Sequence, residues 1–216
     1  MAYTIYNYHN NIIPIMEKTL IFVDWDDTLF PTEWVRTSNV DLNYPSIETV
    51  QMFGELDKLI TDMIINMTFL GSVLIVTNGS SGWVNICLNV LPNFKQIIEG
   101  EAISVTSARD LFSHEHKTNE WKKLTFKIFF NEHFNESVVY RILSFGDSDA
   151  EHEAVQELKN YNNEGNKQKR IIGSIKFIKY PSLNDLINQL ETVRLIHKDI
   201  VMISDDNIFN LADFIL

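Results

Sequence analysis

The sequence predicts an α/β fold: a three-layer, Rossmann-like parallel sheet of about five core strands, with helices on both faces. Short apolar runs alternate with segments whose apolar residues recur every three or four positions, as strands alternating with helices do. Three of these runs end directly in polar side chains, at Asp24, Thr77 and Asp147. Ligands of such sheets bind outside the carboxyl ends of the strands, so these side chains mark the expected site.

The composition suits a single domain over residues 1–216. Hydrophobic residues make up 45% of the 216, enough for a substantial core. The net charge of -11 and a pI near 4.9 argue against nucleic acid and anionic membranes as partners, because both attract a basic face. The most apolar window, residues 59–76, contains Asp62, Asn66 and Gly71. It therefore predicts a helix followed by a strand, and we expect no transmembrane segment.

The single cysteine, Cys87, excludes a disulfide within the chain and fits a reducing compartment. The first residues show neither a basic region nor an apolar stretch of the kind found in signal peptides. We therefore expect a cytoplasmic protein, and export by a route without a cleavable signal stays open as the alternative.

The first part of the chain leads into the expected central strand. Residues 1–17 have no clear period and include Pro14, which predicts an irregular lead-in. Residues 19–24 are an apolar run short enough for a buried strand. Residues 29–45 carry prolines and asparagines without a period, which predicts a flap loop over the end of that strand.

A long amphipathic helix is expected next, opened by Ser46 or Ile47. Its apolar face is formed by residues at steps of three and four: Val50, Phe53, Leu56, Leu59, Ile60, Met63 and Ile64. Gly71 ends this segment, and residues 72–76 form the second strand. Residues 83–91 suggest a short helix that Pro92 terminates.

The second half repeats the alternation. Thr118 is a plausible N-cap of a helix. Pro181 and Ser182 open the last helix, and residues 200–216 form a tail that is either a docking surface or core. The other expected elements are strands over 102–105, 137–145 and 171–178, a helix over 150–158 and an exposed loop over 160–170.

Three carboxylates crowd the end of the first strand, at Asp24, Asp26 and Asp27. Carboxylates so close repel one another and are costly to bury unless a cation lies among them. Because Thr77 and Asp147 end two other strands, the sequence predicts a metal site at this edge of the sheet.

In these features the chain resembles the haloacid dehalogenase (HAD) superfamily of phosphohydrolases. The Asp-x-Asp-x-Thr motif of that family is matched by Asp24 to Thr28, its second motif by the strand ending in Thr77, and its fourth by Gly146-Asp147. The third motif is a lysine near the start of a helix. Lys122 is the preferred candidate, with Lys117 and Lys123 as alternatives. The resemblance covers residues 20–178, and the gaps between its motifs leave no room for a large cap domain.

The resemblance implies a Mg²⁺-dependent phosphatase in which Asp24 is the nucleophile and Asp26 the general acid and base. Asp24, the backbone carbonyl of Asp26 and Asp147 would hold the metal, with Asp149 or Glu151 behind them.

In the same reading, three groups would bind the phosphate: Thr77, Asn78 and Lys122.

The substrate is argued from a narrower likeness. The segment after the first motif, Thr28-Leu29-Phe30-Pro31, resembles small uncapped magnesium-dependent phosphatases that act on phosphotyrosine. A phosphoprotein is therefore favoured, with Trp25, Phe30 and Trp34 as possible stacking partners for an aryl phosphate. The alternatives are a small phosphorylated metabolite and a degenerate binding module without catalytic activity. The oligomeric state is left open.

Overall fold

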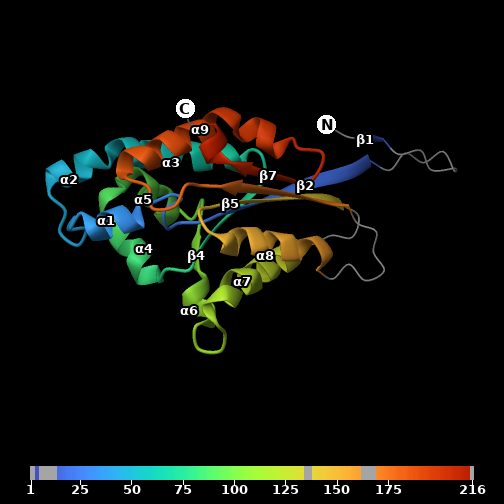
Figure 1. Cartoon of the computed structure of the whole chain (residues 1–216), viewed down its shortest axis with the longest axis horizontal. Coiled ribbons are helices and arrows are strands. Elements are labelled where there is room, and N and C mark those ends of the chain that lie inside the picture. Colours follow the sequence, from blue (N-terminus) through green and yellow to red (C-terminus); the bar gives the residue numbers. More distant parts are fainter. Residues whose placement is uncertain (1–2, 5–13, 134–137, 162–168, 215–216) are drawn as a thin grey trace.

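The computed structural model describes residues 3–4, 14–133, 138–161 and 169–214, and it has the predicted α/β architecture (Figure 1). Six parallel strands form one sheet in the order β4-β3-β2-β5-β6-β7, and β1 pairs antiparallel with β2. The strands are β1 (Tyr3–Thr4), β2 (Pro14–Val23), β3 (Ser72–Thr77), β4 (Val105–Ser107), β5 (Val138–Gly146), β6 (Arg170–Lys176) and β7 (Asn207–Asn210).

The central strand is β2, as expected. It lies between β3 and β5, and its side chains alternate between two cores. Ile21 and Val23 face one core, while Leu20 and Phe22 face the other. All four are buried, as in a parallel strand covered on both faces.

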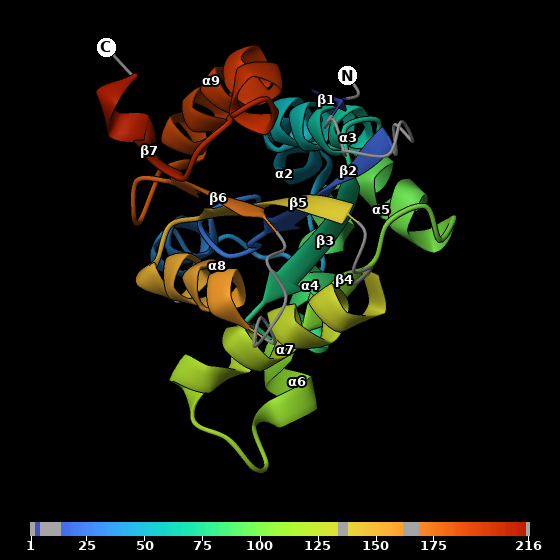
Figure 2. The same cartoon turned by 90° about the vertical axis from the view of Figure 1, so that its right-hand side faces the viewer.

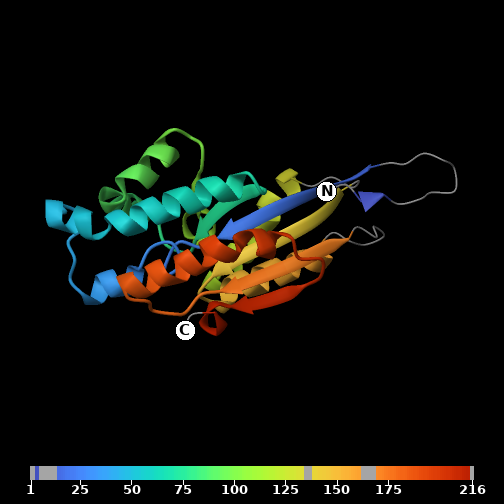
Figure 3. The same cartoon turned by 90° about the horizontal axis from the view of Figure 1, so that it is seen from above.

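Helices cover both faces of the sheet (Figures 1 and 2). One face carries α3 (Gly54–Thr68), α5 (Pro92–Glu99) and α9 (Leu183–Val201), whose apolar residues form the first core. Figure 3 shows α3 and α9 side by side over the sheet. The other face carries α7 (Thr118–His133) and α8 (Asp149–Asn160). Among the described residues, no element forms a separate cap domain.

The sheet extends further than the sequence pattern indicated. The strand β2 starts at Pro14, five positions early, because Pro14 and Ile15 pair with β1 and the backbone from Met16 onward pairs with β5. Residues 1–2 and 5–13 of the expected lead-in lie outside the described residues. The sixth strand, β7, comes from the expected tail and pairs with β6. Leu211, just after it, is fully buried, so this part of the tail belongs to the core.

The long helix expected from residue 46 is divided in two. Ser46 caps α2 (Ile47–Met52) by accepting a hydrogen bond from the Thr49 backbone N–H at 3.1 Å, and α3 begins after Phe53. The Phe53 side chain is fully buried at this junction. The apolar residues expected on one long helix therefore do pack against the core, but they are divided between two helices, α2 and α3.

Pro92 begins a helix as well as following one. Residues before it form α4 (Ser81–Cys87) and a short 3₁₀ turn (Leu88–Val90), and Pro92 is the first residue of α5. Proline fits this position because the N–H it lacks would have no partner inside the helix. The buried Asp57 carboxylate accepts the backbone N–H groups of Asn93 and Phe94, each at 2.9 Å, and so fixes this N-terminus.

The expected flap is not purely a loop. Residues Thr32–Thr37 form helix α1, whose N-terminus is held by Asp27, which accepts the backbone N–H of Glu33 at 3.0 Å. A second short helix, α6 (Ala108–Phe112), precedes α7. Both helices are too short for a sequence period to reveal them.

Within the part of the chain that the structure describes, no helix is long and apolar enough to cross a membrane.

Candidate active site

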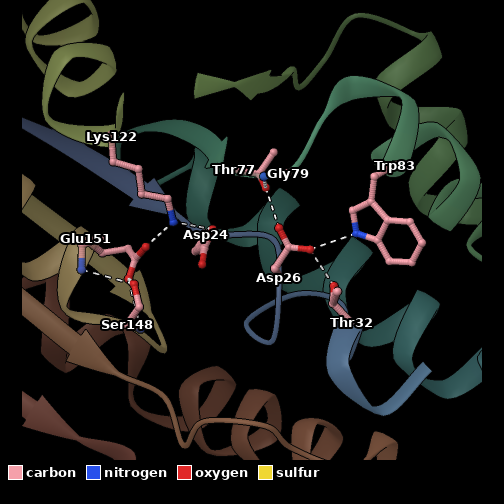
Figure 4. A network of polar contacts seen from close by, with 10 residues as sticks. Asp24, Asp26, Thr32, Thr77, Gly79, Trp83, Lys122, Ser148 and Glu151 are labelled. Carbon is pink, nitrogen blue, oxygen red and sulfur yellow. Dashed lines mark hydrogen bonds and ion pairs between the residues drawn. The ribbon is translucent and has the colours of Figure 1, made fainter. Parts of the chain in front are cut away.

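Three neighbouring strands bring their polar ends together. Asp24 follows β2, Thr77 ends β3, and Asp147 follows β5. The backbone N–H of Asp24 donates to the Phe145 carbonyl at 2.9 Å, which continues the pairing of β2 with β5 to the site itself. The three predicted residues therefore lie at the carboxyl ends of adjacent strands, and Figure 4 shows Asp24 and Thr77 there.

A buried lysine joins two of the acids. The Nζ atom of Lys122 lies 2.6 Å from Oδ1 of Asp24 and also contacts Oε1 of Glu151 (Figure 4). All three side chains are at most 5% exposed. Burial lowers the pKa of Lys122, but the charges of Asp24 and Glu151 outweigh it and raise that pKa above its ordinary value. The lysine is therefore an ammonium ion in a dry setting.

The alternative lysines lie elsewhere. Lys117 is exposed before the first turn of α7. Lys123 points to the helix surface, where its Nζ lies 2.9 Å from Glu153. Lys122 lies on the face of α7 that also buries Thr125 and Phe126, the face turned toward the sheet. Of the three candidates, only Lys122 contacts Asp24.

In and just after the fourth motif, Gly146 and Ser148 position the side chain of Glu151. Ser148 caps α8, and its backbone N–H and hydroxyl donate to Oε2 of Glu151 at 3.1 and 2.7 Å. Gly146 leaves room for this carboxylate, because a Cβ there would lie 2.4 Å from Cγ of Glu151. Gly146 thus lets the backbone pass close to the Glu151 side chain, and Asp147 places an acid directly after β5.

Asp24, Asp147 and Glu151 form a compact group of acids. Each offers a carboxylate oxygen, and these oxygens lie within 4.8 Å of one another. Burial raises the pKa of Asp147 to about 6, with the Glu151 charge acting in the same direction and Lys122 opposing. Burial likewise raises the pKa of Asp24. A bound cation would relieve this cost, and a donor set made only of oxygen atoms is the kind that Mg²⁺ takes.

Two other groups were expected at or near the metal, the backbone carbonyl of Asp26 and the carboxylate of Asp149, and the structure places them in different surroundings. Among the described residues, no hydrogen bond ends on the backbone carbonyl of Asp26, so that oxygen is available to a cation. Asp149, in contrast, is exposed and pairs with Lys176 at 2.7 Å. Of the two acids expected behind the metal, Glu151 lies in the cluster and Asp149 lies outside it.

The side chain of Asp26 is held by three donors (Figure 4). Its Oδ1 accepts from the Thr32 hydroxyl at 2.6 Å and from Nε1 of Trp83 at 2.9 Å, and its Oδ2 accepts from the Thr77 hydroxyl at 2.7 Å. Thr77 in turn accepts the backbone N–H of Gly79 at 2.8 Å. The resemblance implies that the Thr77 hydroxyl donates to a phosphate oxygen. In this structure the same hydroxyl donates to Asp26.

Sequence reasoning missed Thr32 and Trp83. Thr32 begins α1 in the flap, and Trp83 lies in α4, directly after the second motif. No sequence signal marks Thr32, and the one signal for Trp83 was its residue type, because an indole N–H usually has an acceptor when it is buried.

A hollow of about 450 Å³ opens beside Asp26, and we call it the site hollow. Asn78 lines it, as the expected role in phosphate binding requires, and among the described residues its buried Oδ1 has no hydrogen-bond partner. The lining residues are Asp26, Asp27, Thr32, Glu33, Arg36, Asn78, Gly79, Ser80, Trp83 and Arg109.

The expectation that Trp25 and Phe30 contact substrate is wrong for this conformation, because both side chains are fully buried. The Phe30 backbone N–H donates to the Trp25 carbonyl at 2.9 Å, so the segment folds back and both rings stack beneath the site with centroids 6.1 Å apart. Trp34 is partly buried against Phe53. The aromatic residue that does line the site hollow is Trp83.

Comparison of the chain with protein-family models, curated proteins and solved structures finds no match.

Proposed function

We propose that this chain is a Mg²⁺-dependent phosphomonoesterase that works through an aspartyl-phosphate on Asp24, as its resemblance to the HAD superfamily implies. The observation that carries the proposal is the buried ammonium of Lys122 on the Asp24 carboxylate, at the strand edge that also holds Asp147. A phosphate dianion repels nucleophiles, so its transfer requires positive charge beside the attacking group.

In the first step a carboxylate oxygen of Asp24 attacks phosphorus, and the bond from phosphorus to the ester oxygen breaks. Asp26, in its protonated form, gives its proton to the departing oxygen. In the second step Asp26 takes a proton from water, and the water oxygen attacks phosphorus. The phosphorus–Asp24 bond breaks, which releases inorganic phosphate and restores the carboxylate.

The other residues would set the electrostatics of these steps. Lys122 would neutralise charge on the phosphoryl oxygens, and Asn78 offers a side-chain amide at the site hollow. Asp24, Asp147 and the carbonyl of Asp26 would hold Mg²⁺, which when bound supplies further positive charge for the phosphoryl group. Thr32, Thr77 and Trp83 would orient the Asp26 carboxylate.

For the substrate we propose a phosphoprotein, with phosphotyrosine favoured. The described residues contain no cap domain that would enclose a small metabolite, and the site hollow adjoins a second one. Stacking on Trp25 or Phe30 no longer supports an aryl group, but the indole of Trp83 lines the site hollow and could contact one.

The test is Mg²⁺-dependent release of phosphate from phosphotyrosine and from a small aryl phosphate. Asp24→Asn should abolish it and prevent labelling of the protein by a phosphate donor. The matched control is Asp62→Asn, which removes an exposed carboxylate on α3 and should leave turnover unchanged. Full turnover by Asp24→Asn would reject the nucleophile, and no turnover by the natural chain on any phosphoester would reject the enzyme.

A further inference from the structure

Two hollows adjoin at the flap. The site hollow beside Asp26 shares Arg36 and Trp83 with a second hollow of about 360 Å³, which we call the apolar hollow. Four aliphatic side chains line the apolar hollow: Val35, Val40, Leu42 and Ile86. The Trp83 indole and four polar residues, Arg36, Asn39, Asp41 and Asn43, complete its lining. The two hollows therefore meet at Arg36 and Trp83, with Asp26 in the lining of one and flap residues in the lining of the other.

The site hollow also carries two arginines, Arg36 and Arg109. Arg109 is exposed, and within the described residues no carboxylate forms an ion pair with its guanidinium. Its neighbour Asp110 instead accepts the backbone N–H of Ser81 at 2.8 Å. The charge of Arg109 acts on Asp110 without a direct ion pair between them, so its guanidinium can bind an anion without first breaking one.

Arg36 is at the junction of the two hollows. Its guanidinium lies 3.1 Å from Glu33, one turn earlier on the same helix, and 69% of the side chain is exposed. An exposed pair of this kind contributes little, so a carboxylate from a ligand can compete for the arginine. Three carboxylates, those of Asp26, Asp27 and Glu33, line the same hollow, but each already has a partner in the structure. Asp26 accepts three hydrogen bonds, Asp27 accepts the backbone N–H of Glu33, and Glu33 pairs with Arg36. Guanidinium groups bind carboxylates through paired hydrogen bonds.

We propose that the substrate is an acidic phosphopeptide, a refinement that rests on the proposed phosphatase activity. The phosphorylated residue reaches Asp24 and Asp26, a neighbouring acidic side chain binds Arg36 and Arg109, and an apolar side chain of the same peptide occupies the apolar hollow. An extended peptide presents successive side chains about 3.3 Å apart along its backbone, so one chain can place an acidic side chain at the arginines and an apolar one in the apolar hollow.

The experiment compares phosphotyrosine peptides of equal length whose neighbouring residues are acidic, neutral or basic, all with the same apolar residue. The acidic peptide should have about tenfold higher kcat/KM than the neutral one, mainly through KM. Arg36→Ala combined with Arg109→Ala should bring the ratio near one, and Arg109→Glu should favour the basic peptide. Arg194→Ala, an exposed arginine on α9, is the matched control and should preserve the ratio.

Two arms separate this inference from the proposed function. Hydrolysis of a small aryl phosphate by the natural chain tests catalysis alone. Peptide dissociation constants measured with Asp24→Asn test recognition without turnover. Equal kcat/KM and equal affinity for the three peptides, or a sugar phosphate or nucleotide preferred about a hundredfold over all of them, would overturn the acidic phosphopeptide.

Discussion

Lys122 and Asp24 come from elements nearly a hundred residues apart, yet Nζ of the lysine lies 2.6 Å from Oδ1 of the aspartate, with both side chains buried. Glu151 contacts the same ammonium from α8. One buried cation thus serves two buried carboxylates, and such an arrangement is stable only while every member is present.

Lys122→Met keeps the volume and removes the charge. We expect it to lower kcat by about a hundredfold or more, since a preorganised cation at the reacting group is lost. It should also destabilise the fold by about 3 kcal/mol, because two buried carboxylates lose their counter-ion. Steady-state kinetics and denaturant unfolding measure the two effects.

Lys117→Met is the control, because Lys117 is exposed and does not reach Asp24. If Lys117→Met lost more activity than Lys122→Met, the third-motif lysine would have to be reassigned.

Gly146→Ala tests how the Glu151 carboxylate is placed. The added Cβ would lie 2.4 Å from Cγ of Glu151, so the side chain has to move away from Lys122. We expect a destabilisation of about 1–3 kcal/mol and a fall in kcat. Gly54→Ala, at a helical position with open space around the new methyl group, should instead be neutral or stabilise by about 0.5 kcal/mol. Equal unfolding midpoints for the two variants would contradict this account of Gly146.

The features that the sequence predicted correctly are those set by residues close together in the chain. The central strand is recognisable because it is apolar on both faces, and Asp24 and Asp147 follow strand ends. The parallel order, with β2 between β3 and β5, follows from the alternation of strands and helices.

The features that could not be predicted depend on residues far apart in the chain. β7 is a strand because it pairs with β6, and the carboxylate of Asp57 caps the N-terminus of α5 from 36 residues away along the chain. Trp83 reaches Asp26 across 57 positions, and no spacing rule connects them. The burial of Trp25 follows from a backbone turn that its apolar neighbours alone do not specify.

Asp147→Asn tests the cost of the acid cluster in the metal-free protein. The pKa of Asp147 is raised to about 6 from an ordinary value of 3.8, so the folded state holds this proton more tightly than the unfolded state does. The stability linked to this proton is fully present below pH 3.8 and is lost as the pH rises through about 6.

In EDTA, Asp147→Asn should therefore match the natural chain near pH 4 and exceed it at pH 7, by on the order of 1–2 kcal/mol after allowance for solvent screening. At pH 7, Mg²⁺ should raise the Tm of the natural chain and leave that of the variant unchanged. Thermal melts at both pH values, with and without Mg²⁺, make the comparison. A variant less stable at pH 7 would show that the carboxylate is not under strain.

Trp83→Phe removes the indole N–H that donates to Asp26 at 2.9 Å while keeping an aromatic ring against Phe30. If Trp83 orients the general acid and base, kcat should fall by about tenfold and KM should change by less than about twofold. Thr32→Val removes a second donor to the same oxygen and should act alike, whereas Thr32→Ser keeps the hydroxyl and should restore most of the rate. A purely structural role would instead lower the unfolding midpoint in step with activity. Parallel losses in Thr32→Val and Thr32→Ser would mean that the hydrogen bonds to Asp26 do not control the reaction.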